Sequence, residues 1–300
     1  SLLIKWRGIS FIHRLFPPVV VGPVIILIVL SLAGTGVNMA KDNWILALVA
    51  LFTAVCVTML GKGLLKLIPI FSGIIVGYVV GLLFFDIDLA PVAAAPWFSL
   101  PQFVTPQFSL EAVLFLAPVA IAPVIEHVGD IYAVNSVTGK DFVKDPGLHR
   151  TMLGDGLACA AAGIIGGPPV TTYSEVTGAI SLTKITDPVV IRIAAVAGIL
   201  FSVFGKVSAL LKTIPAPVLG GIMMLLFGTI ASVGINNLIR NKTDLGNTRN
   251  LIISSLILTF GIGGAVFQFG EFTIAGTGLA SLIGVILNLV LPNHTKVAHE

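Results

Sequence analysis

Long apolar stretches joined by short polar links constrain this chain more than any other feature. About 20 apolar residues span the hydrocarbon core of a bilayer. The chain is 56% hydrophobic and only 10% charged, whereas soluble domains are about 25% charged. A water-soluble fold would expose far too much apolar surface, so we expect an all-α polytopic membrane protein. The predicted helices cover residues 16–38, 43–60, 67–85, 111–138, 148–166, 188–205, 212–236, 249–264 and 273–292.

One apolar stretch is interrupted by the pair Pro168-Pro169. The next residues, 170–173 (Val-Thr-Thr-Tyr), favour extended structure. We expect one short extended strand here, followed by a half-helix over about residues 175–184. Irregular backbone at membrane depth is tolerated only where it lines a protein cavity. The broken segment therefore predicts a binding site.

The distribution of Lys and Arg predicts the orientation. If the broken segment counts as one crossing, 14 of the 17 Lys and Arg residues lie on one side of the membrane, and the other side holds Lys41, Lys206 and Lys212. The positive-inside rule places the richer side, and with it the C-terminus, in the cytoplasm. The loop 86–110 has no Lys or Arg and is expected outside. Because the basic residues form no single face, no nucleic-acid partner is expected.

Two of the apolar helices resemble each other. Residues 16–22 (FPPVVVG) resemble residues 214–220 (IPAPVLG), and at the same offset residues 33–38 (AGTGVN) resemble residues 231–236 (ASVGIN). Counted through the predicted crossings, the two helices run in opposite directions. This predicts an inverted repeat, which is typical of alternating-access secondary transporters. The alternative is chance similarity between helices rich in Gly and Pro.

Three acids within or beside apolar stretches are the main candidate site residues. An ionised acid at the centre of a membrane helix costs roughly 2.5 to 3.5 kcal/mol and by default marks a polar pathway. Glu126 and Asp130 lie one helical turn apart on one face. Two acids so placed would couple their protons, which suits proton-coupled transport. Glu175 stands where the extended segment meets the half-helix, beside free backbone N–H groups. The alternatives are solvated acids at a helix end and, for Glu175, a simple helix cap.

Other polar residues can extend this site. Asp155 either belongs to the same polar core or pairs with Arg150. Tyr173 either stacks on a planar ligand or packs on the scaffold. His127 points to a different face from Glu126, so packing or an interhelical hydrogen bond is expected. No spacing typical of zinc ligands occurs, so no metal is expected. Further hydroxyl groups are available at Thr171, Thr172 and Ser174.

Three further patterns are residues 125–129 (IEHVG), 144–150 (KDPGLHR) and 171–175 (TTYSE), and Gly178 and residues 183–184 continue the last motif. In these stretches the chain resembles the nucleobase–ascorbate transporter family, also called nucleobase:cation symporter-2, and most closely its bacterial uracil permeases. The similarity runs along essentially all 300 residues.

The resemblance implies fourteen membrane segments in two inverted repeats of seven, divided between a core domain and a gate domain, and a homodimer. This chain would correspond to segments five to fourteen, with the first four missing. On this expectation residues 1–105 form the first part of the gate domain, with three membrane helices. Residues 106–206 form the second half of the core domain, with the substrate site. Residues 207–300 form the second part of the gate domain and the C-terminal tail.

The resemblance also implies roles for the candidate residues. Glu126 would accept hydrogen bonds from the base, and Glu175 would contact its other edge together with Ser174, Tyr173 and backbone amides. Glu126 and Asp130 would couple protons to transport, with no cofactor. Apart from the resemblance, the sequence offers Asp155 and Thr172 as further candidates for the polar core.

The expected function is therefore that of a proton-coupled nucleobase importer of a bacterial inner membrane, and not that of an enzyme. Glu175 favours uracil, because xanthine carriers usually have Gln at this position. Asp130 is more usual in relatives that transport purines, so xanthine or another purine is the alternative. An anion carrier of the sulfate-transporter architecture is a more distant alternative, which two acids at the site disfavour.

Overall fold

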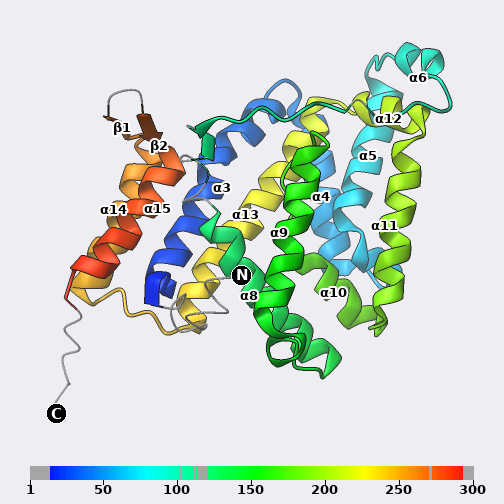
Figure 1. Cartoon of the computed structure of the whole chain (residues 1–300). Coiled ribbons are helices and arrows are strands. Elements are labelled where there is room, and N and C mark those ends of the chain that lie inside the picture. The colour runs from blue at the N-terminus through cyan, green and yellow to red at the C-terminus, as the bar shows by residue number, and fades with distance from the viewer. Residues whose placement is uncertain are drawn as a thin grey trace. The chain divides into compact units, whose positions relative to one another are not determined.

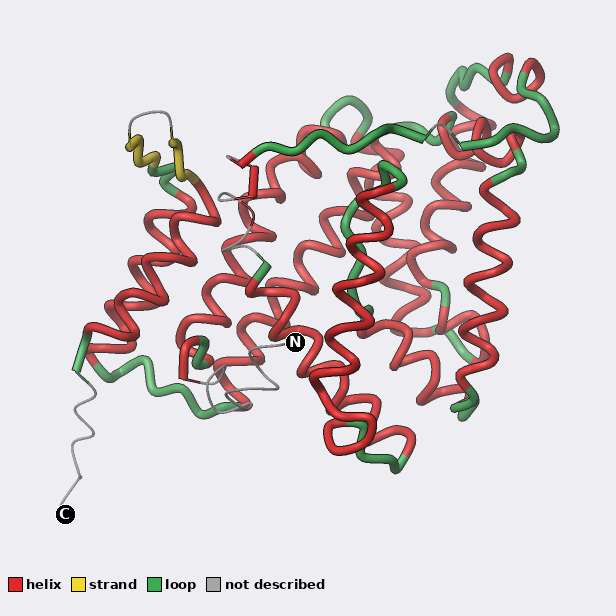
Figure 2. Tube along the Cα trace, in the orientation of Figure 1, coloured by secondary structure: helices red, strands yellow, loops and turns green. Residues whose placement is uncertain are grey.

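The computed structural model describes residues 14–101, 103–110, 112, 113, 116, 120–269 and 272–292. These residues are mostly helical, as the sequence predicts (Figures 1 and 2). The helices of five or more residues are α3 (Pro18–Ala40), α4 (Trp44–Leu60), α5 (Pro69–Phe84), α6 (Ala90–Ala94), α8 (Ile121–Thr138), α9 (Leu148–Ile164), α10 (Ser174–Thr183), α11 (Pro188–Ser202), α12 (Gly205–Lys212), α13 (Ala216–Arg240), α14 (Thr248–Ile262) and α15 (Gly276–Val290), with a 3₁₀ turn at Gly63–Leu67 and a π turn at Val143–Gly147.

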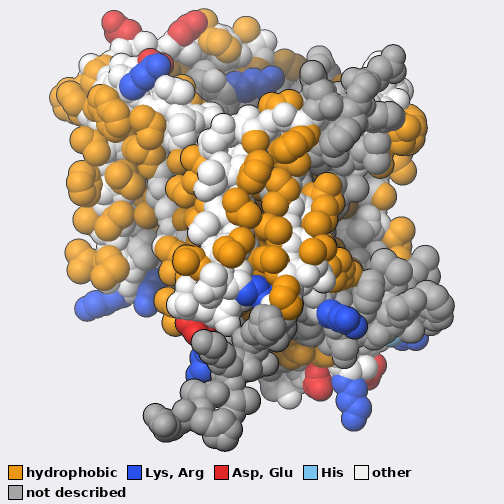
Figure 3. All heavy atoms as spheres, turned by 90° about the vertical axis from the view of Figure 1, so that its left-hand side faces the viewer, with side chains coloured by type: hydrophobic (Ala, Val, Ile, Leu, Met, Phe, Trp, Pro, Cys, Tyr) orange, Lys and Arg blue, Asp and Glu red, His pale blue; other side chains and the backbone are white. Residues whose placement is uncertain are grey.

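Two of these helices, α3 and α13, are long and apolar enough to cross a membrane by themselves. They have 23 and 25 residues. Five shorter apolar helices accompany them: α4, α5, α11, α14 and α15. On the face that carries α14 and α15, hydrophobic side chains run along the middle of the surface (Figure 3). Such a surface fits contact with lipid tails.

Side chains at several helix starts explain where the helices begin. Asn43 accepts hydrogen bonds from the backbone N–H groups of the first turn of α4. Asp187 and Asn247 do the same for α11 and α14. A cap of this kind stabilises a helix by about 1 kcal/mol. Pro69 and Pro188 occupy the first turns of α5 and α11, where proline needs no hydrogen-bond partner.

Residues 167–173 form no strand, so the prediction of a short strand in the broken segment is wrong. A strand requires ladder hydrogen bonds to a neighbour, and within the described part of the chain the only sheet is the pair β1–β2. Tyr173 nevertheless has extended backbone angles, φ −134° and ψ 111°. The half-helix predicted after it is present as α10.

The pair β1 (Val266–Phe269) and β2 (Phe272–Ala275) was not predicted. The two strands are antiparallel, with Val266 opposite Ala275. Aromatic and β-branched residues in this stretch favour strands. As a result, the last helix begins at Gly276 and not at residue 273. The short helix α12, which follows α11, was also missed.

The chain forms two compact units. Unit 1 comprises residues 1–32, 106–172 and 228–300, and unit 2 comprises residues 33–105 and 173–227. Helices α3 and α13 contribute residues to both units. The division into gate and core domains, derived from the resemblance, stays a prediction.

The two units have similar cores, in which one long helix packs against a pair of helices. In unit 1 the long helix is α3 and the pair is α14 and α15 (Figure 1). In unit 2 the long helix is α13 and the pair is α4 and α5. The buried side chains of these two clusters are Val19, Val20, Val24, Leu27, Ile253, Ile257 and Ala280 in unit 1, and Leu46, Ala50, Ala54, Val218 and Ile222 in unit 2.

Glycines allow α3 and α13 to approach each other closely. In unit 1, a Cβ atom added to Gly22 would lie 2.9 Å from the carbonyl oxygen of Gly234. In unit 2, a Cβ atom added to Gly220 would lie 2.8 Å from the carbonyl oxygen of Gly36. Small residues at helix contacts are typical of membrane proteins, where van der Waals packing drives association.

Arg249, at the start of α14, and Asn288 of α15 together join three chain segments of unit 1. Arg249 Nη2 donates to the carbonyl oxygen and to Oδ1 of Asn288 on α15, at 2.6 and 2.9 Å, and Arg249 Nε donates to the carbonyl oxygen of Leu291 at 3.1 Å. Asn288 Nδ2 in turn donates to the carbonyl oxygen of Arg14 at 2.9 Å. Arg249 thus satisfies carbonyl groups that the end of a helix leaves without partners.

We expect Arg249→Ala to lower the stability of unit 1, because three charge-assisted hydrogen bonds are lost together. Each hydrogen bond to a charged group contributes about 1.5–3 kcal/mol, so a clear fall in the midpoint of thermal unfolding in detergent is expected. Arg192, on α11, is exposed, and Arg192→Ala is the matched control. Equal midpoints for the two variants would contradict this role.

Candidate functional site

The candidate site begins with α8 and α9, two helices of unit 1 joined by residues 139–147, which include the π turn. α8 ends at Gly139, whose φ of 71° is left-handed and therefore favours glycine. α9 begins after Gly147, with φ 96°. Val128 of α8 packs on Leu148 and Met152 of α9 to form a small buried cluster. This packing fixes α8, which carries Glu126 and Asp130, against α9.

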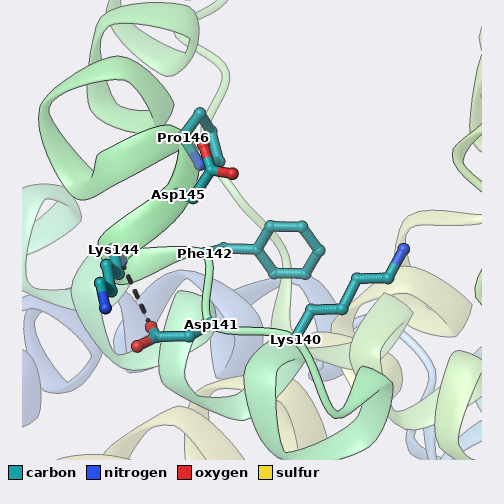
Figure 4. Close-up of a pocket in the computed structure, with 6 residues that line it drawn as sticks. All are labelled: Lys140, Asp141, Phe142, Lys144, Asp145 and Pro146. Carbon is teal, nitrogen blue, oxygen red and sulfur yellow. Dashed lines mark hydrogen bonds between the residues drawn. The ribbon is translucent and has the colours of Figure 1, made fainter.

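The turn between the two helices forms an open pocket of about 540 Å³ (Figure 4). Asp141 orders the turn: its Oδ1 accepts from Asn135 Nδ2 at 3.2 Å and from the backbone N–H of Val143 at 3.1 Å. Two lysines and two aspartates face this pocket, so it has no net charge to attract an ion. The lining residues are Lys140, Asp141, Phe142, Lys144, Asp145 and Pro146, none of which was a predicted site residue.

Glu126 and Asp130, one turn apart on α8, lie in different surroundings. The Glu126 side chain is exposed. The Asp130 side chain is buried, with 7% of its surface exposed. Glu126 can therefore contact a ligand directly, whereas Asp130 lies inside the protein one turn further along.

His127 is the centre of a polar cluster between α8 and α9. It is 2% exposed, and its Nε2 lies 3.0 Å from Thr151 Oγ1. This is the interhelical hydrogen bond that was one of two predictions for His127. Its Nδ1 lies 3.8 Å from Asp155 Oδ2. Asp155 Oδ2 also accepts a hydrogen bond of 3.3 Å from Thr171 in the broken segment. The cluster thus connects α8, α9 and the broken segment.

The broken segment leads from this cluster to α10, which belongs to unit 2. Thr172 is half-buried, and its Oγ1 has no hydrogen-bond partner. Tyr173 is 57% exposed, and its side chain does not cap the first turn of α10. Ser174 and Glu175 are the first residues of α10, and their side chains lie outside the described residues. A helix start of this kind presents backbone N–H groups to a ligand.

Sequence reasoning missed Thr151. The available signal was its spacing: Thr151 and Asp155 are four residues apart and therefore lie on one face of α9. Which face meets α8 is not visible in the sequence. Within the described residues, no group of three His, Cys, Asp or Glu side chains could hold a metal ion.

The sequence of this chain is similar to those of known proteins. Residues 1–269 match the model of a family described as the permease family. A probable uracil permease of Haemophilus influenzae is 52% identical, over 97% of this chain and 73% of the relative. The uracil permease of Bacillus caldolyticus is 44% identical, over 100% of this chain and 73% of the relative. The uracil permease of Escherichia coli K12 is 36% identical, over 97% of this chain and 70% of the relative.

Proposed function

Because this chain belongs to the permease family, a family of multi-pass membrane transporters and not of enzymes, we propose that it imports uracil across a bacterial inner membrane together with protons. The observation that carries the proposal is the similarity to several uracil permeases along nearly the whole chain. The exposed acid on α8 also supports it, because a carboxylate can accept hydrogen bonds from the ring N–H groups of a nucleobase.

The chemistry of uracil suits these groups. A uracil ring presents N–H donors and carbonyl acceptors along its edge. Glu126, an exposed carboxylate, can accept from ring N–H groups. Backbone N–H groups at the start of α10 can donate to ring carbonyl oxygens, with Glu175 and Ser174 beside them. Tyr173 is exposed and can stack on the ring.

Proton coupling is proposed for the acid pair on α8. An ionisable group within a membrane helix commonly serves a proton pathway. Glu126 is exposed and Asp130 is buried one turn away. We propose that binding of a base to Glu126 is accompanied by binding of a proton to this pair. Uptake of the base and of a proton would then be coupled.

An inverted repeat is the architecture that we propose, and the packing of glycines supports it. Gly22 and Gly220 are 198 residues apart, and so are Gly36 and Gly234. Gly22 contacts Gly234, and Gly220 contacts Gly36. If Gly22 is equivalent to Gly220 and Gly36 to Gly234, the second contact is the first with the two helices interchanged. A pair of helices related by two-fold symmetry has contacts of this kind. This arrangement favours alternating access between a core and a gate domain. A homodimer and a cytoplasmic C-terminus complete the proposal, the latter from the positive-inside rule.

Uptake of radiolabelled uracil into proteoliposomes tests the proposal. With the outside at pH 6, uptake is expected to exceed uptake at pH 8 and to collapse when a protonophore abolishes the proton gradient. Excess unlabelled xanthine is expected to leave it unchanged. Asp130 favours a purine site by resemblance, so block by xanthine would establish the alternative substrate. Absence of acid stimulation would refute proton coupling.

A further inference from the structure

The hydrogen-bond partners of Thr151 favour the tautomer of His127 that carries its hydrogen on Nε2. Thr151 Oγ1 lies 3.1 Å from the carbonyl oxygen of Leu148, which can only accept, so Thr151 donates its single hydrogen there. With that hydrogen directed at Leu148, Thr151 Oγ1 accepts from His127 Nε2 across their 3.0 Å contact. In a neutral ring with its hydrogen on Nε2, Nδ1 is an acceptor.

The acceptor Nδ1 faces an acidic oxygen. Asp155 Oδ2 lies 3.8 Å away and already accepts from Thr171. Nδ1 is buried and has no hydrogen-bond partner, which is costly for a polar atom inside a protein. Two acceptors that face each other repel. One added proton, on either atom, turns this contact into a hydrogen bond.

Burial of the ring opposes a positive charge on it, and the negative charges of two nearby acids offset part of that cost. From α9, Asp155 acts on His127, and from the next turn of α8 Asp130 acts on it as well. Glu126, the neighbouring acid on α8, is exposed. The rest of the contact between the two helices consists of the apolar residues Val128, Leu148 and Met152. Both nearby charges are negative, and the surroundings offer little solvent to screen them.

We propose that His127 and Asp155 form a second proton-binding site, distinct from the Glu126–Asp130 pair. The proposal rests on the proposed proton-coupled transport and adds a second proton locus to it. With the proton bound, Nδ1–H donates to Asp155, and the 3.8 Å gap closes to hydrogen-bond distance. Without it, the two acceptors separate. Because Asp155 holds Thr171, the proton state is transmitted to the broken segment that leads to Thr172 and Tyr173.

Nitrogen-15 NMR of histidine-labelled protein in nanodiscs tests the site without any substrate. The signal that disappears in His127→Gln belongs to His127. It is expected to show the Nε2–H form at high pH and a protonated ring at low pH. In Asp155→Asn the amide donates permanently to Nδ1, so the ring is expected to stay neutral across the range. His149→Gln, the control, leaves this signal unchanged. An Nδ1–H form at high pH, or an unaltered titration in Asp155→Asn, would refute the site.

The pH dependence of uracil uptake tests coupling separately. In Asp155→Asn, the slope of log uptake against pH is expected to fall by about one, the value for one proton fewer. His127→Gln, which retains a donor toward Thr151, is expected to lower this slope by the same amount. If the NMR titration occurs but both slopes equal that of the unaltered protein, the pair takes no part in transport and the coupling is refuted. If the protein carries another solute, the NMR result stands, and only the proposed function fails.

Discussion

Glu126→Gln is expected to reduce uracil uptake at low substrate concentration by about 10- to 100-fold, because charge-assisted hydrogen bonds contribute about 1.5–3 kcal/mol and every 1.4 kcal/mol changes affinity about tenfold. The Glu126 side chain is exposed on α8, so the substitution changes charge without opening a cavity in the core. A neutral amide still accepts a hydrogen bond from the ring, but more weakly. The loss should therefore appear as a higher KM. The acid stimulation of uptake should also weaken.

The measurement is the initial rate of uracil uptake in proteoliposomes over a range of uracil concentrations at pH 6 and pH 8. Asp86→Asn is the matched control, since it also replaces a carboxylate by an amide. Asp86 is exposed and lies just beyond α5. Normal uptake by Glu126→Gln with an unchanged proton requirement would show that Glu126 neither binds the base nor couples the proton.

Gly221→Val is expected to prevent stable folding of unit 2. A Cβ atom at this position of α13 would overlap the carbonyl oxygen of Ala47 on α4, and it would lie 2.8 Å from the carbonyl carbon. The obstacle is backbone and cannot move aside as a flexible side chain would. Overpacking a well-packed contact costs about 1–3 kcal/mol and occasionally more. Here the whole helix must shift, so we expect the upper end of this range or beyond.

Gly228 provides the control for this prediction. It lies on the same helix, and an added Cβ atom would meet nothing within 4 Å. Gly228→Ala should leave the midpoint of thermal unfolding unchanged or raise it, because alanine favours helix over glycine by about 1 kcal/mol. Gly221→Ala should lower the midpoint, and Gly221→Val should lower the yield of folded protein in detergent. Equal midpoints for the two alanine variants would contradict the close approach of α13 and α4.

The helices were predictable because the thickness of a bilayer sets how long an apolar stretch must be. The long helices α3 and α13 lie close to their predicted ranges, and the Pro168-Pro169 pair correctly placed the half-helix α10. Besides the missed short helix α12, the errors concern strands. Residues 167–173 favour extended structure locally but form no strand, because a strand depends on a partner elsewhere in the chain. The β1–β2 pair was missed because an apolar, aromatic-rich stretch of this length also fits the start of a membrane helix.

The acids of the candidate site could also be found from the sequence, since the cost of charge in an apolar helix makes Glu126 and Asp130 conspicuous. The contacts of His127 could not. Thr151 is 24 residues away from His127, and Thr171 is 16 residues away from Asp155. These side chains meet only because α8 and α9 pack with particular faces together. Spacing along one helix defines a face, but it does not identify the neighbour of that face.

The sequence by itself determined the class of this protein, most of its membrane helices and the acids of its candidate site. The tertiary structure decided which side chains share hydrogen bonds, and in particular that His127 and Asp155 face each other across α8 and α9. The reason lies in the solvent. Lipid tails are as apolar as a protein interior, so the outward and inward faces of a membrane helix carry similar residues. Apolar periodicity, which reveals the buried face of a helix in water, therefore says little about which helices meet in a membrane.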